Sequence, residues 1–81
     1  MRMTILACAV LAPAAALAEP PPPNAMPLSQ LVATLEADVG ADLAYVESVE
    51  WDDDGYWEVE YRTADDREVE VDLDPTTGKP R

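Results

Sequence analysis

The sequence predicts an α+β domain in which one amphipathic helix packs on a three-stranded antiparallel β-meander. Apolar residues first recur at helical spacing from Leu28 to Val39, and the period falls to two after Ala41. Two short, acid-rich turn segments divide this second part into three strand-like runs. Because each element is apolar on one face only, the helix and the sheet are expected to bury these faces against each other.

Residues 1–18 precede the domain and have the composition of a secretory signal peptide. Arg2 gives a positive start, residues 4–17 are apolar, and Ala16 and Ala18 are the small residues of a cleavage site. The alternative is a transmembrane anchor, but a membrane span needs about 20 apolar residues and this run is shorter. We therefore expect a periplasmic or secreted protein that has no membrane attachment after cleavage.

Residues 19–26 form a second segment, and the domain itself is expected to occupy residues 27–81. The segment contains the run Pro20 to Pro23, which favours an extended polyproline conformation without a core of its own. We interpret it as a proline-rich tether. The alternative is a ligand for a proline-reading module.

Residues 19–81 are strongly acidic and contain neither histidine nor cysteine, because the single cysteine, Cys8, lies in the predicted signal peptide. Seventeen acids face four basic residues, a net charge of −13. Such a charge repels nucleic acid and anionic lipid and attracts basic partners or cations. Without histidine or cysteine, His-based triads, thiol catalysis and ordinary zinc sites are excluded. A pair of carboxylates could hydrolyse glycosides, but so short a domain cannot easily wall the necessary cleft. We expect no enzyme and no cofactor.

The predicted helix runs over about residues 28 to 39. One apolar stripe at spacings i, i+3, i+4, i+7 and i+11 defines it: Leu28, Leu31, Val32, Leu35 and Val39. Ser29 or Asn24 is expected to cap its start, and Gly40 stands where a left-handed C-terminal glycine belongs.

The first strand leads into a run of three acids and a glycine, residues 52–55, which could be a calcium loop or a tight turn. An EF-hand loop beginning at Glu50 would place Tyr61 at position 12, where calcium requires a bidentate acid. Its flanks also read as strands rather than helices. In the first strand, three apolar residues share one parity, which Glu47 interrupts: Tyr45, Val49 and Trp51. The segment is therefore expected to be a hairpin turn.

The alternation of side chains fixes the length of both turns, because a slip of one residue reverses a strand. A three-residue loop 53–55 places Trp51 opposite Trp57, with Gly55 in the left-handed conformation. A second three-residue loop, 64–66, requires Asp66 to adopt that conformation, which aspartate tolerates. One face of the predicted sheet then carries the apolar residues, which the helix should cover: Trp51, Trp57, Val59, Tyr61, Val69, Val71 and Leu73.

The same register makes the other sheet face acidic. It places Glu50 opposite Glu58, Glu58 opposite Asp72 and Glu60 opposite Glu70, and only Arg62 opposite Glu68 is complementary. Directly opposed like charges destabilise a sheet by about 0.2–1 kcal/mol each. Either the long side chains splay into water, or the face receives something positive. The candidate contact residues are Tyr56, Glu58, Glu60, Glu70 and Asp72.

The order of elements and turns resembles a PepSY domain over residues 27 to 79. The motifs are the helix closed by Gly40, the aromatic strand 56–60 and the aspartate turn with Thr-Gly at 74–78. The resemblance implies an α+β fold, a bacterial exported protein and a non-catalytic role in inhibiting or regulating peptidases. Members of the family often continue with an apolar strand end after Thr-Gly. Here Lys79-Pro80-Arg81 follows, so no fourth strand is expected.

We therefore expect an envelope interaction module whose acidic face or edge strand docks on a peptidase, or on another envelope protein with a basic surface. The alternative is weak binding of divalent cations by the same carboxylates together with residues 52–54. A structural domain without a ligand is the third hypothesis. The oligomeric state stays open.

Overall fold

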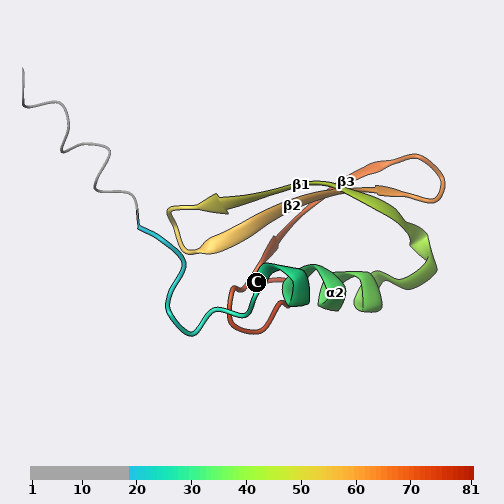
Figure 1. Cartoon of the computed structure of the whole chain (residues 1–81). Helices are drawn as coiled ribbons and strands as arrows, with labels where there is room; N and C mark the ends of the chain where they lie inside the picture. Colours follow the sequence, from blue (N-terminus) through green and yellow to red (C-terminus); the bar gives the residue numbers. More distant parts are fainter. Residues whose placement is uncertain (1–18) are drawn as a thin grey trace, which may run out of the picture.

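The structure, a computed structural model, describes residues 19–81, so the predicted signal peptide lies outside the described residues. Helix α2 (Leu28–Val39) leads into a short 3-10 helix, η2 (Gly40–Asp42), and three strands follow: β1 (Leu43–Asp52), β2 (Tyr56–Thr63) and β3 (Glu68–Leu73). The strands form one antiparallel sheet in the order β1-β2-β3. Helix α2 lies along one side of this sheet (Figure 1). The predicted α+β fold is confirmed.

The buried face of α2 is narrower than the predicted stripe. Leu31 and Leu35 are buried, and Val39 packs partly against them. Leu28 was expected on this face, but its side chain is 42% exposed. Met26, which precedes the helix, packs against the core at this end. The helix therefore contributes its middle and its C-terminal half to the core.

Both ends of α2 depend on main-chain groups. The carbonyl of Pro27 accepts hydrogen bonds from the N–H groups of Gln30 and Leu31 (2.9 and 3.0 Å), and no side chain caps this end. The predicted cap by Ser29 or Asn24 is therefore wrong, because the proline carbonyl serves the first turn instead. Gly40 ends the helix as expected, with a positive φ of 73° and a ψ of −143°, and its N–H donates to the carbonyl of Glu36.

Both predicted hairpin registers are confirmed. Trp51 pairs with Trp57 in the first hairpin, and Tyr61 pairs with Val69 in the second. Gly55 has a φ of 105° and Asp66 a φ of 67°, so both loops use the left-handed residue that their length requires. Asp54 N–H also donates to Asp52 Oδ1 at 2.8 Å, an Asx turn that stabilises the first loop.

Strand β1 differs from the prediction because its pairing with β2 is irregular at two places. The register shifts between Leu43 and Tyr45 and again between Val46 and Ser48. The second shift leaves Glu47 without a partner, as in a β-bulge, so the alternation reverses there. Val46 therefore packs on the core, whereas Tyr45 is 54% exposed. Tyr45 and Val49 were expected on the same face of the strand, and this expectation is wrong because the bulge lies between them.

The core lies between α2 and the sheet and consists of a few side chains: Leu31, Leu35, Val59, Tyr61 and Leu73. Partly buried apolar residues surround them: Met26, Val39, Leu43, Val46, Val49, Trp57, Val69 and Val71. The rings of Trp51 and Trp57 meet edge to face with centroids 5.2 Å apart, next to the first hairpin turn. The predicted apolar sheet face thus packs against the core, except for Trp51, which contacts Trp57 and Glu19 instead.

The C-terminal residues turn back along β3. Asp74 Oδ1 accepts hydrogen bonds from the N–H and hydroxyl of Thr76, at 2.8 and 2.7 Å, which closes the turn. Leu73 then forms an isolated antiparallel bridge with Pro80. This bridge is isolated and does not extend into a strand, so the expectation of no fourth strand holds for residues 19–81.

The proline-rich segment contacts the domain at two points. The Trp51 indole N–H donates to the carbonyl of Glu19 (2.6 Å), and Met26 N–H donates to the carbonyl of Pro75 (2.9 Å). The boundary between tether and domain stays a prediction. No helix within residues 19–81 is long and apolar enough to cross a membrane.

Candidate functional site

The predicted contact residues gather on the sheet face that points away from α2. Strand alternation puts Tyr56, Glu58 and Glu60 on the side opposite the buried Val59. The confirmed register sets Glu58 beside Asp72 and Glu60 beside Glu70, and Glu50 of β1 lies on the other side of Glu58. We call the set Glu50, Glu58, Glu60, Glu70 and Asp72 the acidic face.

Repulsion across the acidic face is strongest at Glu58. Its pKa is raised above the ordinary 4.5, mainly by the negative charge of Glu70. Partial desolvation, a hydrogen bond to Glu70 and the charges of Asp72 and Glu50 act in the same direction. A carboxylate with such neighbours is stabilised by a proton or by any positive group that approaches it.

Ser48 supports the acidic face from β1 and was not identified from the sequence. Its hydroxyl donates to Glu60 Oε1 at 2.9 Å across the β1–β2 pairing. The bulge at Glu47 is what brings Ser48 opposite Glu60. An alternation pattern alone gives no signal for this contact, because the bulge changes the parity of the strand.

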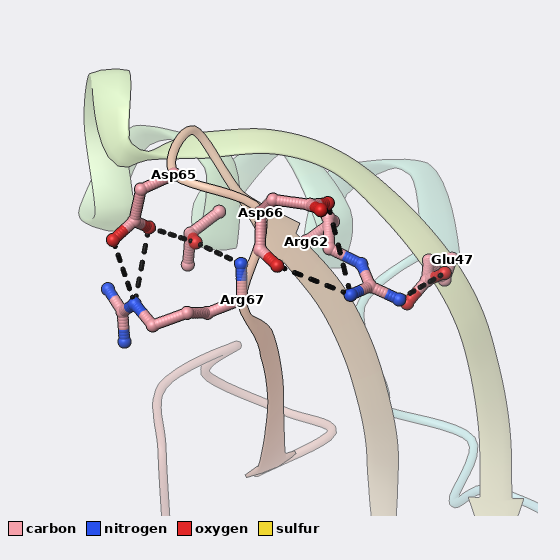
Figure 2. Close-up of polar contacts among 6 residues, drawn as sticks. Glu47, Arg62, Asp65, Asp66 and Arg67 are labelled. Atoms are coloured by element: carbon pink, nitrogen blue, oxygen red, sulfur yellow. Dashed lines mark hydrogen bonds and ion pairs between the residues drawn. The ribbon is translucent and has the colours of Figure 1, made fainter.

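Arg62 lies at one end of the acidic face but is engaged elsewhere. Its guanidinium lies 3.5 Å from the carboxylate of Glu47 and also contacts Asp66 (Figure 2). The charge of Glu47 is the main reason that the pKa of Arg62 is raised. Arg62 is the strand neighbour of Glu68 as predicted, yet its ion pairs are with the bulge residue and the hairpin loop.

Two further cations are also paired with acids outside the acidic face. Arg67 Nε lies 3.0 Å from Asp65 Oδ2 in the second hairpin (Figure 2). The hydrogen bond from the Thr63 hydroxyl, followed by the contact with Arg67, holds the pKa of Asp65 below its ordinary 3.8. Lys79 Nζ lies 3.1 Å from the Asp38 carboxylate on α2. Neither cation therefore compensates the charges on the acidic face.

Arg81 is the cation that does reach this side of the sheet. Its guanidinium carbon lies 4.3 Å from the centroid of the Tyr56 ring, a cation–π contact. Desolvation, followed by the hydrogen bond and charge of Asp52 and by the charges of Asp72 and Glu58, raises the pKa of the Tyr56 hydroxyl. The phenol thus lies among carboxylates, and its ring offers a platform for a guanidinium.

The acidic face is an open surface. Residues 19–81 enclose no pocket, and no three potential ligand residues among them are placed to hold a metal ion. What the arrangement offers chemically is a broad negative surface beside the Tyr56 ring, which already carries the guanidinium of Arg81, and such a surface suits the binding of an extended or flat basic surface.

Comparison with known proteins agrees with this architecture. The family model described as "Peptidase propeptide and YPEB domain" matches residues 2–80, nearly the whole chain. Neither the curated proteins nor the solved structures contain a significant match. The helix, the meander and the aspartate turn resembled the PepSY pattern, and the family model covers all three. The chain therefore belongs to the PepSY family of peptidase-propeptide and YPEB domains.

Proposed function

We propose that this chain is an exported, non-catalytic module that binds a peptidase in the bacterial envelope and inhibits or regulates it. Membership of a peptidase-propeptide family supports the class of partner. The observation that carries the proposal is the acidic face. Within residues 19–81, its directly opposed carboxylates form no ion pair with a basic side chain, and three of the four basic residues in this range pair with acids elsewhere.

The physical role of the acidic face is electrostatic complementarity. A fixed negative surface attracts a partner that presents lysines and arginines, and speeds their encounter. Binding also relieves the repulsion that raises the pKa of Glu58. The association is therefore expected to weaken as ionic strength rises, because added salt screens exposed charges.

The test compares two variants with the same change in net charge. The first neutralises the acidic face with Glu58→Gln, Glu60→Gln, Glu70→Gln and Asp72→Asn. The control neutralises four acids outside it with Glu19→Gln, Glu36→Gln, Asp53→Asn and Asp54→Asn. Each protein is titrated into assays of peptidases that the source bacterium exports. Residual peptidase activity is measured at several salt concentrations.

We expect wild type and control to inhibit at least one peptidase, and the acidic-face variant to lose about tenfold or more in potency, as for loss of several charged contacts. Equal losses in the two variants would mean that only net charge matters. If wild type changes the activity of none of these peptidases, the proposed function is wrong.

A further inference from the structure

We propose that the outer edge of β3 binds an extended segment of the partner as an added strand, and that this segment alternates basic and apolar residues. The inference rests on the proposed function as a binding module, and it specifies the contact surface and the kind of segment. It follows from the main-chain geometry of β3, from the irregular pairing of β1 at the other edge of the sheet and from the side chains of β3 itself.

The C-terminal residues reveal which main-chain groups of β3 point outward. Arg81 N–H donates to the carbonyl of Asp72 (3.1 Å), and Asp74 N–H donates to the carbonyl of Lys79 (2.8 Å). Along an antiparallel strand, alternate residues direct both main-chain groups to the same side. The N–H and C=O groups of Glu68 and Glu70 therefore also point away from β2.

These outward groups are open. Within residues 19–81, β3 pairs with β2 and, through Leu73 alone, with Pro80. No other main-chain group in this part of the chain hydrogen-bonds to the main-chain groups of Glu68 or Glu70, and both residues are exposed. Among residues 19–81, the C-terminal residues lie beside residues 72–74 of this edge, and no strand lies beside residues 68–71.

The opposite edge of the sheet is less suited to strand addition. Strand β1 has two register irregularities, around Ala44 and Glu47. Such irregularities bend a strand and disrupt its ladder, a common protection of sheet edges. Glu47 is also held by Arg62. Strand β3 pairs with β2 in unbroken register from Glu68 to Leu73, so its outer edge is the regular one.

The side chains along β3 define the chemistry of the added strand. Residues opposite Glu68 and Glu70 would project onto the acidic face, close to Glu60, and should be arginine or lysine. Residues opposite Val69 and Val71 would project to the helix side, where both valines are only partly buried, and should be apolar. A second copy of this chain is disfavoured, since pairing β3 with β3 would oppose acids with acids.

Arg81 shows how a residue that pairs with the outer edge of β3 can direct its side chain. Its main chain pairs with Asp72, and its guanidinium reaches the Tyr56 ring on the acidic side. A basic residue of the partner that pairs with the same edge, two residue positions beyond Arg81, would meet Glu70 in an equivalent orientation. The antiparallel direction set by residues 79–81 is therefore the expected direction of the partner segment.

The experiment titrates the ¹⁵N-labelled protein, without the predicted signal peptide, with two synthetic hexapeptides of equal composition. One alternates arginine and valine, and the other groups three arginines before three valines. Amide hydrogen exchange and chemical shifts are followed by NMR. We expect the alternating peptide to bind about fivefold or more tightly than the grouped one, as for the loss of two or more favourable cross-strand side-chain pairs, and to slow exchange at the Glu68 and Glu70 amides.

A pair of variants separates main-chain pairing from charge. Glu70→Pro removes an outward N–H and leaves the β2–β3 ladder intact, as proline at a sheet edge allows. Glu70→Gln removes the charge and keeps the N–H. We expect Glu70→Pro to weaken the alternating peptide about threefold or more beyond the effect of Glu70→Gln, with circular dichroism checking that both variants remain folded.

Equal binding of both peptides, or protection along β1 instead of β3, would overturn the inference, and the wild-type exchange pattern decides this even if the proline variant unfolds. Such a result would leave the proposed function standing, provided that the acidic-face variant still loses peptidase inhibition. Edge binding without any affected peptidase would support the inference and remove the peptidase as partner.

Discussion

At the scale of single residues, Gly78 is the most constrained position in the C-terminal turn. It is buried with a φ of 74°, a conformation that side chains with a Cβ rarely adopt. A Cβ there would lie 3.1 Å from Met26 Sδ and 3.3 Å from Thr34 Cβ. Because glycine has no Cβ, the turn can approach α2, so Gly78 brings the end of β3 close to the middle of the helix and to the segment before it.

We predict that Gly78→Ala destabilises the protein more than Gly55→Ala. Gly55 also has a positive φ, but nothing lies within 4 Å of a Cβ there. Backbone strain alone should cost about 1–2 kcal/mol at Gly55, and crowding should add about 1–3 kcal/mol at Gly78. Urea unfolding of both variants measures the difference. Equal losses would show that the turn moves aside without cost.

Removing one charge from the acidic face should stabilise the fold. Glu70 lies directly opposite Glu60 and is the main cause of the raised pKa of Glu58. We predict that Glu70→Gln raises the free energy of unfolding by about 0.2–1 kcal/mol, the usual size of a cross-strand pair term. Glu36→Gln, on the exposed side of α2, is the control and should have little effect. A less stable Glu70→Gln variant would contradict the described repulsion.

At the scale of elements, packing divides each apolar pattern into a buried and an exposed part. In α2, Leu31 is fully buried whereas Leu28 is 42% exposed, although both belong to one helical stripe. In β1, the irregularity at Glu47 turns Val46 inward and Tyr45 outward. The bulge also aims Glu47 at Arg62, so the same irregularity blunts one sheet edge and engages a cation.

The two leucines of α2 provide a matched pair for testing this division. We predict that Leu31→Ala destabilises the protein by about 2–5 kcal/mol, the range for a buried leucine truncated in a core. Leu28→Ala should change stability by no more than about 0.5 kcal/mol, as exposed substitutions usually do. Thermal and urea unfolding measure both. Similar losses would mean that α2 lies on the sheet in another rotation.

At the scale of the whole molecule, charge sets the dependence of stability on pH. Glu58 binds its proton more tightly in the folded protein than in the unfolded chain, because its pKa is raised above 4.5. Stability should therefore increase as the pH falls towards that value. Asp65 and Asp74 have pKa values lowered below 3.8, chiefly by hydrogen bonds from Thr63 and Thr76 respectively. Their contribution is present above that value and is lost as the pH falls below it.

We predict a melting temperature that rises from pH 7 to a maximum at mildly acidic pH, close to the ordinary carboxyl values of 3.8 and 4.5, and then falls. Circular dichroism melts from pH 3 to pH 7 give the profile. Glu58→Gln should flatten the rise, and Asp74→Asn should reduce the loss below the maximum. A melting temperature that only falls on acidification would contradict the role given to Glu58.

The sequence by itself determined the fold class, both hairpin loops and the register that builds the acidic face. These features follow from local properties, namely the period of apolar residues and the few residues that tolerate a left-handed backbone, such as Gly55 and Asp66. One prediction about α2 was local as well, the glycine that ends it at Gly40, and it holds.

Only the tertiary structure decided which carboxylates pair with the basic side chains, where β1 forms its bulges and how residues 74–81 turn back along β3. Arg62 has several carboxylates within reach, and its pairing with Glu47 depends on a bulge that the alternation pattern does not encode. Arg81 meets Tyr56, and Gly78 meets Thr34, through contacts between segments distant in the chain. Such contacts depend on the packing of whole elements, which residue spacing alone cannot specify.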